Sequence, residues 1–544
     1  MPKSATHLSP APAAISQVRS PCLVHDRTLG GRAIAPFTAA ASTTPLSALE
    51  DGARGGSLQA SRSPEKPRKF VAASCSDPLL QCSCDPAEFD AILAAMGDRP
   101  SMARLLESQP KDYGSNSSLL ESGARVKKSR GVKKRVIVSA VANLSTAYNL
   151  AVINYALMMI QRSYPPSSPE VTSTVVSCSL VGAILGQLTF GYIGDAIGRR
   201  KGMILTLLLS ILGALASALL PWGDNAIYPV LAACRFVLGL GVGGVYPLSA
   251  TTAIESSHDE VKNSKIVAAV FSFQGVGQLL APLMAYLLVQ LRLHDVYGWR
   301  LLLGIGALPG LFVLREAFEA TETCEYRSSR HRDGESSASD LSDVIRQDKT
   351  LWWKLLGASL GWFLFDITFY GNVIFTPIIL KDTFGFDNSH LKDVTLDSLF
   401  VAAMGLPGYI TTVLVVGHMD FRRIQIMGFV VMALLFAVLG LFYKSLLSHT
   451  ALLLTLYSLT FFFSNFGPNV STFCLPAEIF PSDVRIKMNG IAAASGKIGA
   501  TVGAAVFGIV EKTSGVSDVL VLSAIVSLLG ALVTIYLVPR KQYR

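Results

Sequence analysis

The stretch from Trp362 to Tyr370, which reads W-F-L-F-D-I-T-F-Y, places one carboxylate in the middle of a long apolar run. Asp366 lies four residues from each end of the stretch, so a helix brings all three side chains to one face. A charge at bilayer depth costs at least ~2.5 kcal/mol, and such a residue is therefore a candidate for function. Two hydrogen-bonding aromatics around a carboxylate predict a ligand site. The alternative is a structural ion pair between Asp366 and a basic residue of a neighbouring helix.

The composition of the chain is that of a membrane protein. Of its 544 residues, 51% are apolar and only 16% are charged, and the mean hydropathy is +0.44. Uncharged apolar runs of about 20 residues recur, and each is long enough to cross a bilayer. The net charge of +9 sits mainly at the ends of these runs and in the N-terminal tail. This distribution indicates orientation in a membrane rather than binding to nucleic acid.

The apolar runs predict an all-α integral membrane protein with twelve transmembrane helices in two six-helix bundles. Asp366 is the one acid near the middle of a span, and every other acid falls at a span end or in a loop. The predicted spans are residues 136–160, 171–194, 202–221, 227–253, 264–291, 299–318, 353–379, 397–416, 425–444, 449–475, 487–510 and 517–538.

The spans divide the chain into four regions. Residues 1–130 form a tail rich in Ala, Ser, Pro and Arg, which we expect to be disordered, and its acid-poor start also fits a targeting segment. Residues 131–320 hold the first bundle, 321–350 a cytoplasmic linker, and 351–544 the second bundle. Basic residues gather in alternate loops, so the positive-inside rule places both termini in the cytoplasm.

Two short motifs repeat at corresponding places in the two halves. Gly191–Arg200 reads G-Y-I-G-D-A-I-G-R-R after the second span, and Gly417–Arg423 reads G-H-M-D-F-R-R after the eighth. Such a parallel repeat predicts a transporter with its substrate site between the halves. The first motif resembles the signature loop of the major facilitator superfamily, which implies the major facilitator fold. An Asp–Arg pair at a helix end can act as a conformational latch, or it can simply orient the chain. The predicted latch residues are Asp195, Arg199, Arg200 and Asp420.

Five further motifs resemble one branch of that superfamily, the phosphate:proton symporters of plants and fungi. The resemblance extends from about residue 130 to the C terminus and rests on Arg235–Ala250, Phe273–Gly277, Phe463–Asn469, Pro476–Pro481 and Ala494–Ala500.

The resemblance implies a phosphate site between the halves. The residues that match by motif are Tyr246, Gln274, Trp362, Asp366, Tyr370 and one or both of Asn465 and Asn469, with Lys497 nearby. These types suit phosphate, because Tyr, Gln, Trp and Asn donate hydrogen bonds without fixed charge and Lys497 adds one positive charge. As the lone lysine in mid-span, Lys497 must be paired or solvated. For Gln274, Asn465 and Asn469 the alternative is an interhelical hydrogen bond.

The chain departs from the family pattern in its first half. Ser145–Asn149 reads S-T-A-Y-N where the family has T-D-A-Y-D. Gly244–Tyr246 reads G-V-Y where the family has the G-D-Y of its G-G-D-Y motif. Three acids that the resemblance links to proton movement are therefore missing. We expect Asp366 to carry the proton, because an ionised carboxylate repels the phosphate anion. The alternatives are a facilitator without coupling, coupling to another cation, an organic phosphate or other small organic anion as substrate, and a nutrient sensor.

No nucleophile–base set and no convincing cluster of metal ligands stands out in the sequence. We therefore expect no enzyme activity, no cofactor and no metal. The expected partners are a small anion, protons and the lipid bilayer, and no nucleic acid. The family resemblance implies the plasma membrane, and an organellar envelope is the alternative.

Overall fold

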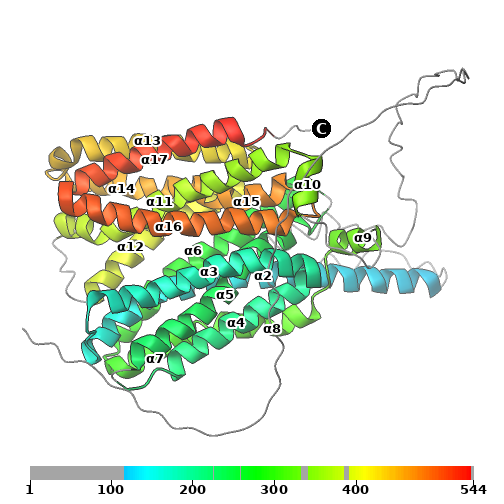
Figure 1. Cartoon of the computed structure of the whole chain (residues 1–544), viewed down its shortest axis with the longest axis horizontal. Helices are drawn as coiled ribbons and strands as arrows, with labels where there is room; N and C mark the ends of the chain where they lie inside the picture. Colours follow the sequence, from blue (N-terminus) through cyan, green and yellow to red (C-terminus); the bar gives the residue numbers. More distant parts are fainter. Residues whose placement is uncertain (1–115, 224–225, 258, 333–340, 385–390, 541–544) are drawn as a thin grey trace, which may run out of the picture. The chain divides into compact units, whose positions relative to one another are not determined.

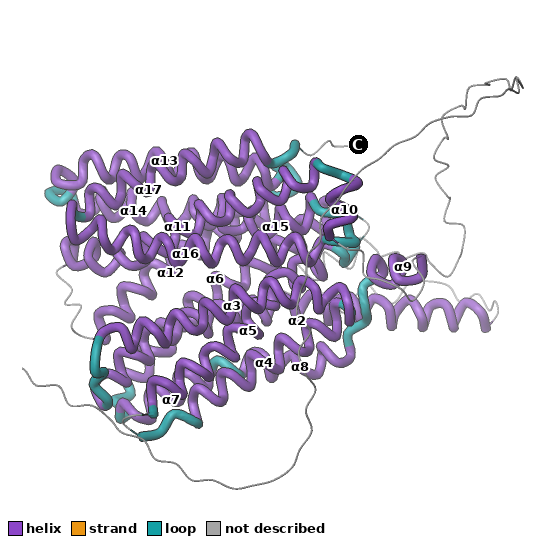
Figure 2. The backbone as a smooth tube through the Cα atoms, viewed as in Figure 1, coloured by secondary structure: helices purple, strands orange, loops and turns teal. Residues whose placement is uncertain are grey.

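The elements of the described chain are helices joined by short loops (Figures 1 and 2). The disordered tail is expected over residues 1–130, of which residues 1–115 lie outside the described residues. From Asn116 to Ser163 the chain is one helix, α2, which begins before the predicted tail boundary at residue 130. The computed structural model describes residues 116–223, 226–257, 259–332, 341–384 and 391–540.

The first bundle contains the first six predicted spans. Its sixth span is divided into two helices that meet at Gly306. Its helices are α2, α3 (Pro169–Ile197), α4 (Arg199–Leu219), α5 (Ile227–Ile254), α6 (Glu260–Gln290), α7 (Asp295–Ile305) and α8 (Leu308–Glu319).

The second bundle contains the other six spans. Its tenth span is interrupted by a single π-helical turn, η1, where Gly467 departs from helical geometry. Its helices are α11 (Thr350–Phe384), α12 (Leu391–Val415), α13 (Phe421–Leu446), α14 (Thr450–Ser464), η1 (Asn465–Asn469), α15 (Val470–Ile479), α16 (Arg485–Ser514) and α17 (Val516–Leu537).

The predicted spans agree with the helices to within a turn or two at each end, except that α2 begins 20 residues before its predicted span. Within the described residues, eleven helical segments are long and apolar enough to cross a membrane. The remaining predicted span, 353–379, lies inside α11. The linker, which the sequence leaves without structure, contains two short helices, α9 (Cys324–Arg332) and α10 (Leu341–Gln347).

The two bundles meet along a few helices near the middle of the fold. Within the first bundle α5 packs on α3 and α4, and α2 packs on α6. Within the second, α11 packs on α16 and α17, and α13 packs on α17. The bundles contact each other mainly where α6 meets α12 and α3 meets α16 (Figure 1). Side chains of these helices therefore face a shared interface.

Each of the two repeated motifs contains a glycine with a positive φ between two helices. Gly198 joins α3 to α4 with φ of 98°, and Gly417 lies between α12 and α13 with φ of 111°. Both values fall in the left-handed region that glycine adopts without strain. We call this end of the fold the basic end, because Arg199, Arg422 and Arg485 lie in or beside its loops.

The break in the sixth span explains the polar residues of the S-T-A-Y-N motif. Asn149 donates a hydrogen bond of 2.9 Å to the carbonyl of Gly306, and Ser145 donates one of 3.3 Å to the same oxygen. A helix break inside a bilayer requires such partners, since no water is present to satisfy the backbone. Ser145 and Asn149 therefore hold α2 against the junction of α7 and α8.

Candidate functional site

A cavity of about 200 Å³ lies between the two bundles. Its wall comes from α2, α5 and α6 of the first bundle and from α11, α12, α14 and η1 of the second. Four of the residues that the sequence singles out line it, namely Tyr246, Gln274, Tyr370 and Asn465. The cavity lies where a parallel-repeat transporter is expected to bind its substrate.

Lys497 and Asp366 form a buried ion pair beside this wall. The Nζ atom of Lys497 lies 3.2 Å from Oδ2 of Asp366 and donates a hydrogen bond of 3.0 Å to the hydroxyl of Tyr370. The side chains of Lys497 and Asp366 are only 3% and 4% exposed. The pair connects α16 to α11, so the basic partner that the sequence left open for Asp366 is Lys497. Because Tyr370 lines the cavity, the pair is also one hydrogen bond away from it.

Tyr246 connects this pair to the first bundle. Its hydroxyl donates to Oε1 of Gln274 over 3.1 Å, and its ring centre lies 5.6 Å from Nζ of Lys497. The indole of Trp362 packs edge-on against the Tyr246 ring, with centroids 6.2 Å apart. Predicted residues from α5, α6, α11 and α16 therefore lie in one cluster that spans both bundles.

The two asparagines of the tenth span belong to a neighbouring hydrogen-bond network. Asn469 donates to the side-chain oxygen of Asn465 over 2.6 Å and to the hydroxyl of Tyr409 over 2.8 Å. Asn465 donates to the carbonyl of Gly405 over 3.1 Å. Tyr409 in turn donates to Oε1 of Gln278 in the first bundle over 3.3 Å. Both asparagines thus make the interhelical bonds that were the alternative to substrate contact, and Asn465 lines the cavity as well.

Five buried aromatic side chains, which we call the aromatic layer, lie on the basic-end side of the cavity. Phe473 stacks on Phe271 with centroids 4.3 Å apart and packs edge-on against Tyr246 at 6.2 Å and Trp362 at 6.5 Å. Tyr409 adjoins Phe271 at 6.2 Å. Since these rings come from both bundles, they close the interface between the cavity and the basic end.

At the basic end, Asp195 and Arg199 belong to an ion-pair network that crosses between the bundles. Arg199 lies 3.1 Å from Asp195 and 3.5 Å from Glu255, all in the first bundle. From the second bundle, Lys487 lies 3.8 Å from Asp195 and Arg485 lies 3.0 Å from Glu255. These groups are largely buried, so removing one leaves the others without compensation.

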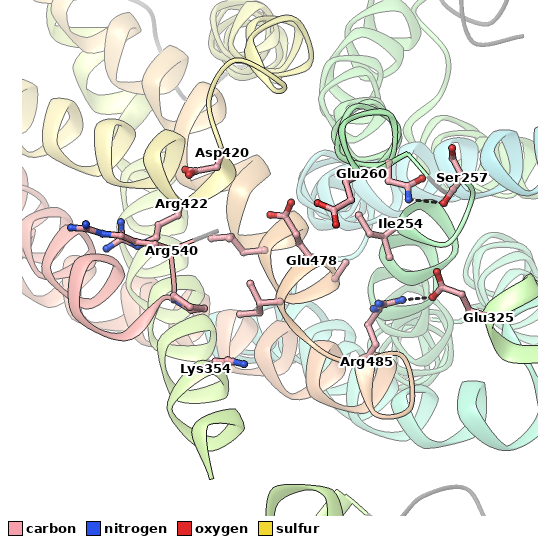
Figure 3. A pocket seen from close by; sticks show the side chains of 15 residues that line it. Ile254, Ser257, Glu260, Glu325, Lys354, Asp420, Arg422, Glu478, Arg485 and Arg540 are labelled. Carbon is pink, nitrogen blue, oxygen red and sulfur yellow. Dashed lines mark hydrogen bonds and ion pairs between the residues drawn. The ribbon is translucent and has the colours of Figure 1, made fainter. Parts of the chain in front are cut away.

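The linker takes part in the same network. Glu325 of α9 accepts a hydrogen bond of 2.8 Å from Arg485, as Figure 3 shows. Tyr326 places its ring 4.8 Å from the guanidinium of Arg199. Burial raises the pKa of Glu325, and the nearby carboxylate of Glu255 raises it further. The linker therefore contacts charged groups of both bundles rather than only joining their ends.

The other two predicted latch residues make contacts near their own bundle. Arg200 donates to the backbone carbonyl of Phe318, and its backbone N–H donates to Glu322 over 3.1 Å. Asp420 caps the start of α13 by accepting from the backbone N–H of Arg423 over 2.7 Å. Among the described residues, the two motifs are thus unequal, since only the first makes ion pairs that cross between the bundles.

A second cavity, of about 430 Å³, lies at the basic end (Figure 3). It is separated from the central cavity by the aromatic layer, as the positions of the lining residues along α5, α6 and α15 show. Charged residues of both signs line it: Glu260, Glu325, Lys354, Asp420, Arg422, Glu478, Arg485 and Arg540. Its polarity suits the end of a path for a charged solute.

The sequence does not single out Tyr409, Glu255 or Asp397, although each has a place in the site. Tyr409 is a polar aromatic in mid-span, and this signal was available. Glu255 lies just beyond the predicted end of the fourth span, where an acid draws no notice. Asp397 lies at the predicted start of the eighth span, but α12 begins earlier, at Leu391. The residue is consequently buried and lines the central cavity.

Comparisons with known proteins agree with this architecture. A family model described as Major Facilitator Superfamily matches residues 138–475. The chain is 34% identical over 426 residues to "Inorganic phosphate transporter PT2" of Toxoplasma gondii (strain ATCC 50861 / VEG), covering 77% of this chain and 74% of that protein. It is 33% identical over 464 residues to "Probable inorganic phosphate transporter 1-6" of Arabidopsis thaliana, covering 73% and 90%.

Among solved structures, the fold is similar to that of the proton:xylose symporter XylE bound to 6-bromo-6-deoxy-D-glucose. The TM-score is 0.64 at 20% identity, covering 76% of this chain and 97% of that one. A partially occluded inward-open structure of XylE from E. coli aligns with a TM-score of 0.58 at 19% identity. At these identities the likeness concerns the fold.

Proposed function

The chain belongs to the major facilitator superfamily and, within it, to the family of the inorganic phosphate transporters, and we propose that it moves inorganic phosphate across a membrane by alternating access. The observation that carries this proposal is the buried cluster at the bundle interface. One lysine and several neutral donors meet there beside a cavity between the two halves.

The chemistry of the cluster supports an anionic substrate. Tyr246, Gln274, Tyr370 and Asn465 offer hydroxyl and amide donors on the cavity wall. Lys497 contributes the positive charge, and it reaches the wall through the hydroxyl of Tyr370. A phosphate anion that entered the cavity would compete with Asp366 for this ammonium group.

That competition supports coupling to a proton through Asp366. In the resting pair, Lys497 lies 3.2 Å from the Asp366 carboxylate and provides its counter-charge. When phosphate draws the ammonium group away, the buried carboxylate is left without a counter-charge, and protonation relieves this. Phosphate and a proton then enter together. When both leave on the other side, Lys497 and Asp366 pair again.

The closed basic end supports an alternating-access cycle. The aromatic layer and the ion pairs of Arg485 and Lys487 with the first bundle close one side of the cavity. Opening that side requires these contacts to separate as the bundles rock. By the positive-inside rule, we assign the basic end and both termini to the cytoplasm. We assign the protein to the plasma membrane, with an organellar envelope as the alternative.

Transport by the purified chain in liposomes tests the proposal. We expect labelled phosphate on one side to exchange with unlabelled phosphate on the other, and we expect Lys497→Ala to abolish this exchange. If sulfate or small organic phosphates exchange while inorganic phosphate does not, the substrate assignment is wrong. If phosphate binds and no solute crosses, the chain is a sensor.

A further inference from the structure

Asp397 of α12 is a buried carboxylate that has no partner among the described residues. It is 1% exposed, and neither of its carboxylate oxygens makes a hydrogen bond to another described group. It nevertheless lines the central cavity. An ionised carboxylate in such surroundings is strongly disfavoured unless it is paired or neutralised. Asp366 differs in this respect, because Lys497 balances its charge.

Asp397 lies where the second bundle closes against the first, at the end of the cavity away from the basic end. Leu391 belongs to a buried apolar cluster of the first bundle that includes Tyr155, and Val394 packs against the same cluster. Val394 lies one turn from both Leu391 and Asp397 on α12, and Asp397 lines the central cavity together with Tyr155 of that cluster. Asp397 therefore lies beside the contact between the bundles that buries Leu391.

The described residues that line the cavity with Asp397 provide no positive charge to balance it. Asp393 lies one turn before it on the same helix and adds negative charge. Within the described part of the chain, the titratable residues that line the cavity with Asp397 are three tyrosines, and none of the lining residues is basic. The tyrosines are Tyr155 on α2, Tyr246 on α5 and Tyr370 on α11, and the neutral polar residues are Asn154, Gln274, Gln278, Ser398 and Asn465.

From this placement we propose that Asp397 is a second proton-binding site besides Asp366. Its proton is required for the cavity to close at the end away from the basic end, which we call the outer end. The proton comes from the solution in the open cavity and forms an O–H bond with one carboxylate oxygen. It returns to solution when the end reopens and the carboxylate is hydrated again. The proposal rests on the proposed function in one respect, since it assumes that this end opens and closes.

The test measures closure directly and without phosphate. Spin labels are attached to the cysteines of Tyr297→Cys and Lys392→Cys in an otherwise cysteine-free full-length chain. Tyr297 is 70% exposed on α7, and Lys392 is exposed on α12. Double electron–electron resonance then reports the distance between the bundles at this end from pH 5 to 8.5. We expect the ratio of the short-distance to the long-distance population to fall with rising pH by up to about tenfold per unit, the slope for one proton.

The variant Asp397→Asn separates the proposal from its alternatives. We expect it to remain in the short-distance state at every pH, whereas Asp397→Glu and the neighbouring control Asp393→Asn keep a pH-dependent profile. The proposal is overturned if Asp397→Asn keeps the wild-type profile, or if closure at fixed pH follows the Na⁺ concentration instead. If Asp397→Asn does not fold, Asp397→Ser provides the same neutral test.

The result is independent of the substrate. A chain that does not exchange phosphate, but whose outer distance follows pH through Asp397, refutes the proposed function and leaves the proton site in place. Phosphate exchange together with a pH-independent distance supports the proposed function and refutes the proton site at Asp397.

Discussion

The ammonium group of Lys497 lies 3.2 Å from a carboxylate oxygen of Asp366, so the positive charge of the site is balanced inside the protein. The same group donates to Tyr370 on the cavity wall over 3.0 Å. An anion in the cavity and the carboxylate on α11 therefore compete for one cation. This relationship joins substrate binding to the protonation of Asp366 and leads to the first prediction.

Removing either partner of this pair is expected to damage the protein more than removing both. Lys497→Ala leaves Asp366 as an uncompensated buried charge, which costs about 3–5 kcal/mol of stability. The double variant Asp366→Asn with Lys497→Gln removes both charges, and we expect most of the stability to return while phosphate transport stays lost. Thermal unfolding in detergent and phosphate exchange in liposomes measure the two effects. Equal melting temperatures for Lys497→Ala and the double variant contradict the assignment.

Tyr246→Phe is expected to weaken phosphate binding about tenfold, or about 1.4 kcal/mol, because it removes a hydroxyl from the cavity wall. Tyr409→Phe is the matched control. It also removes a buried tyrosine hydroxyl, but one that bonds Asn469 and Gln278 beside the cavity. We expect Tyr409→Phe to reduce stability and to leave phosphate affinity nearly unchanged in calorimetric titration. An unaltered affinity in Tyr246→Phe argues against a substrate contact at this hydroxyl.

Much of the fold follows from the sequence because a bilayer imposes strong constraints on it. Long uncharged runs require helices, and their lengths set the span boundaries. The spacing of Trp362, Asp366 and Tyr370 on one face and the need of Lys497 for a partner are also local properties, and the structure joins Asp366 to Lys497.

Contacts between distant parts of the chain are not encoded in any local pattern. Glu255 and Arg485 meet at 3.0 Å although they come from different bundles. Tyr409 bonds Gln278 because α12 packs on α6. Asp397 is missed for another reason: hydropathy places the start of the eighth span too late, so a buried acid is taken for one at a helix end.

Arg485→Ala is expected to open the basic end. Its guanidinium bonds both the buried Glu255 and the partly exposed Glu325, and without it these acids lose a counter-charge. We expect faster labelling of a cysteine introduced at Phe473, in the aromatic layer, by a thiol reagent added from the basic-end side. Arg423→Ala removes an arginine that is 65% exposed and 3.7 Å from Asp420, and surface pairs contribute little. Similar labelling rates in the two variants contradict the role of Arg485 in closure.

Closure of the basic end is expected to depend on pH through Glu325. Its pKa is raised in the closed form, so between its ordinary value of about 4.3 and the raised value the closed form holds more protons than the open form. The contribution of Glu325 to closure therefore becomes less favourable as pH rises through this window. Glu325→Gln removes the effect and increases the closed population at neutral pH.

Spin labels at Lys201 and Arg423, both near the loops of the basic end, measure this population as pH changes. The exposed linker acid Asp343, whose side chain is 62% exposed, provides the control Asp343→Asn. We expect that control to follow the wild-type curve and Glu325→Gln to follow a flatter one. If Glu325→Gln and the wild type have the same pH slope, Glu325 does not titrate in this transition.

The most direct test of the central claim is phosphate accumulation by the purified chain in liposomes under an imposed pH gradient, alkaline inside. The account predicts that the wild type accumulates labelled phosphate above its external concentration. It also predicts that Asp366→Asn does not accumulate phosphate under the same gradient. Accumulation by Asp366→Asn at the wild-type level, or equilibration without accumulation by the wild type, contradicts proton-coupled phosphate transport through Asp366.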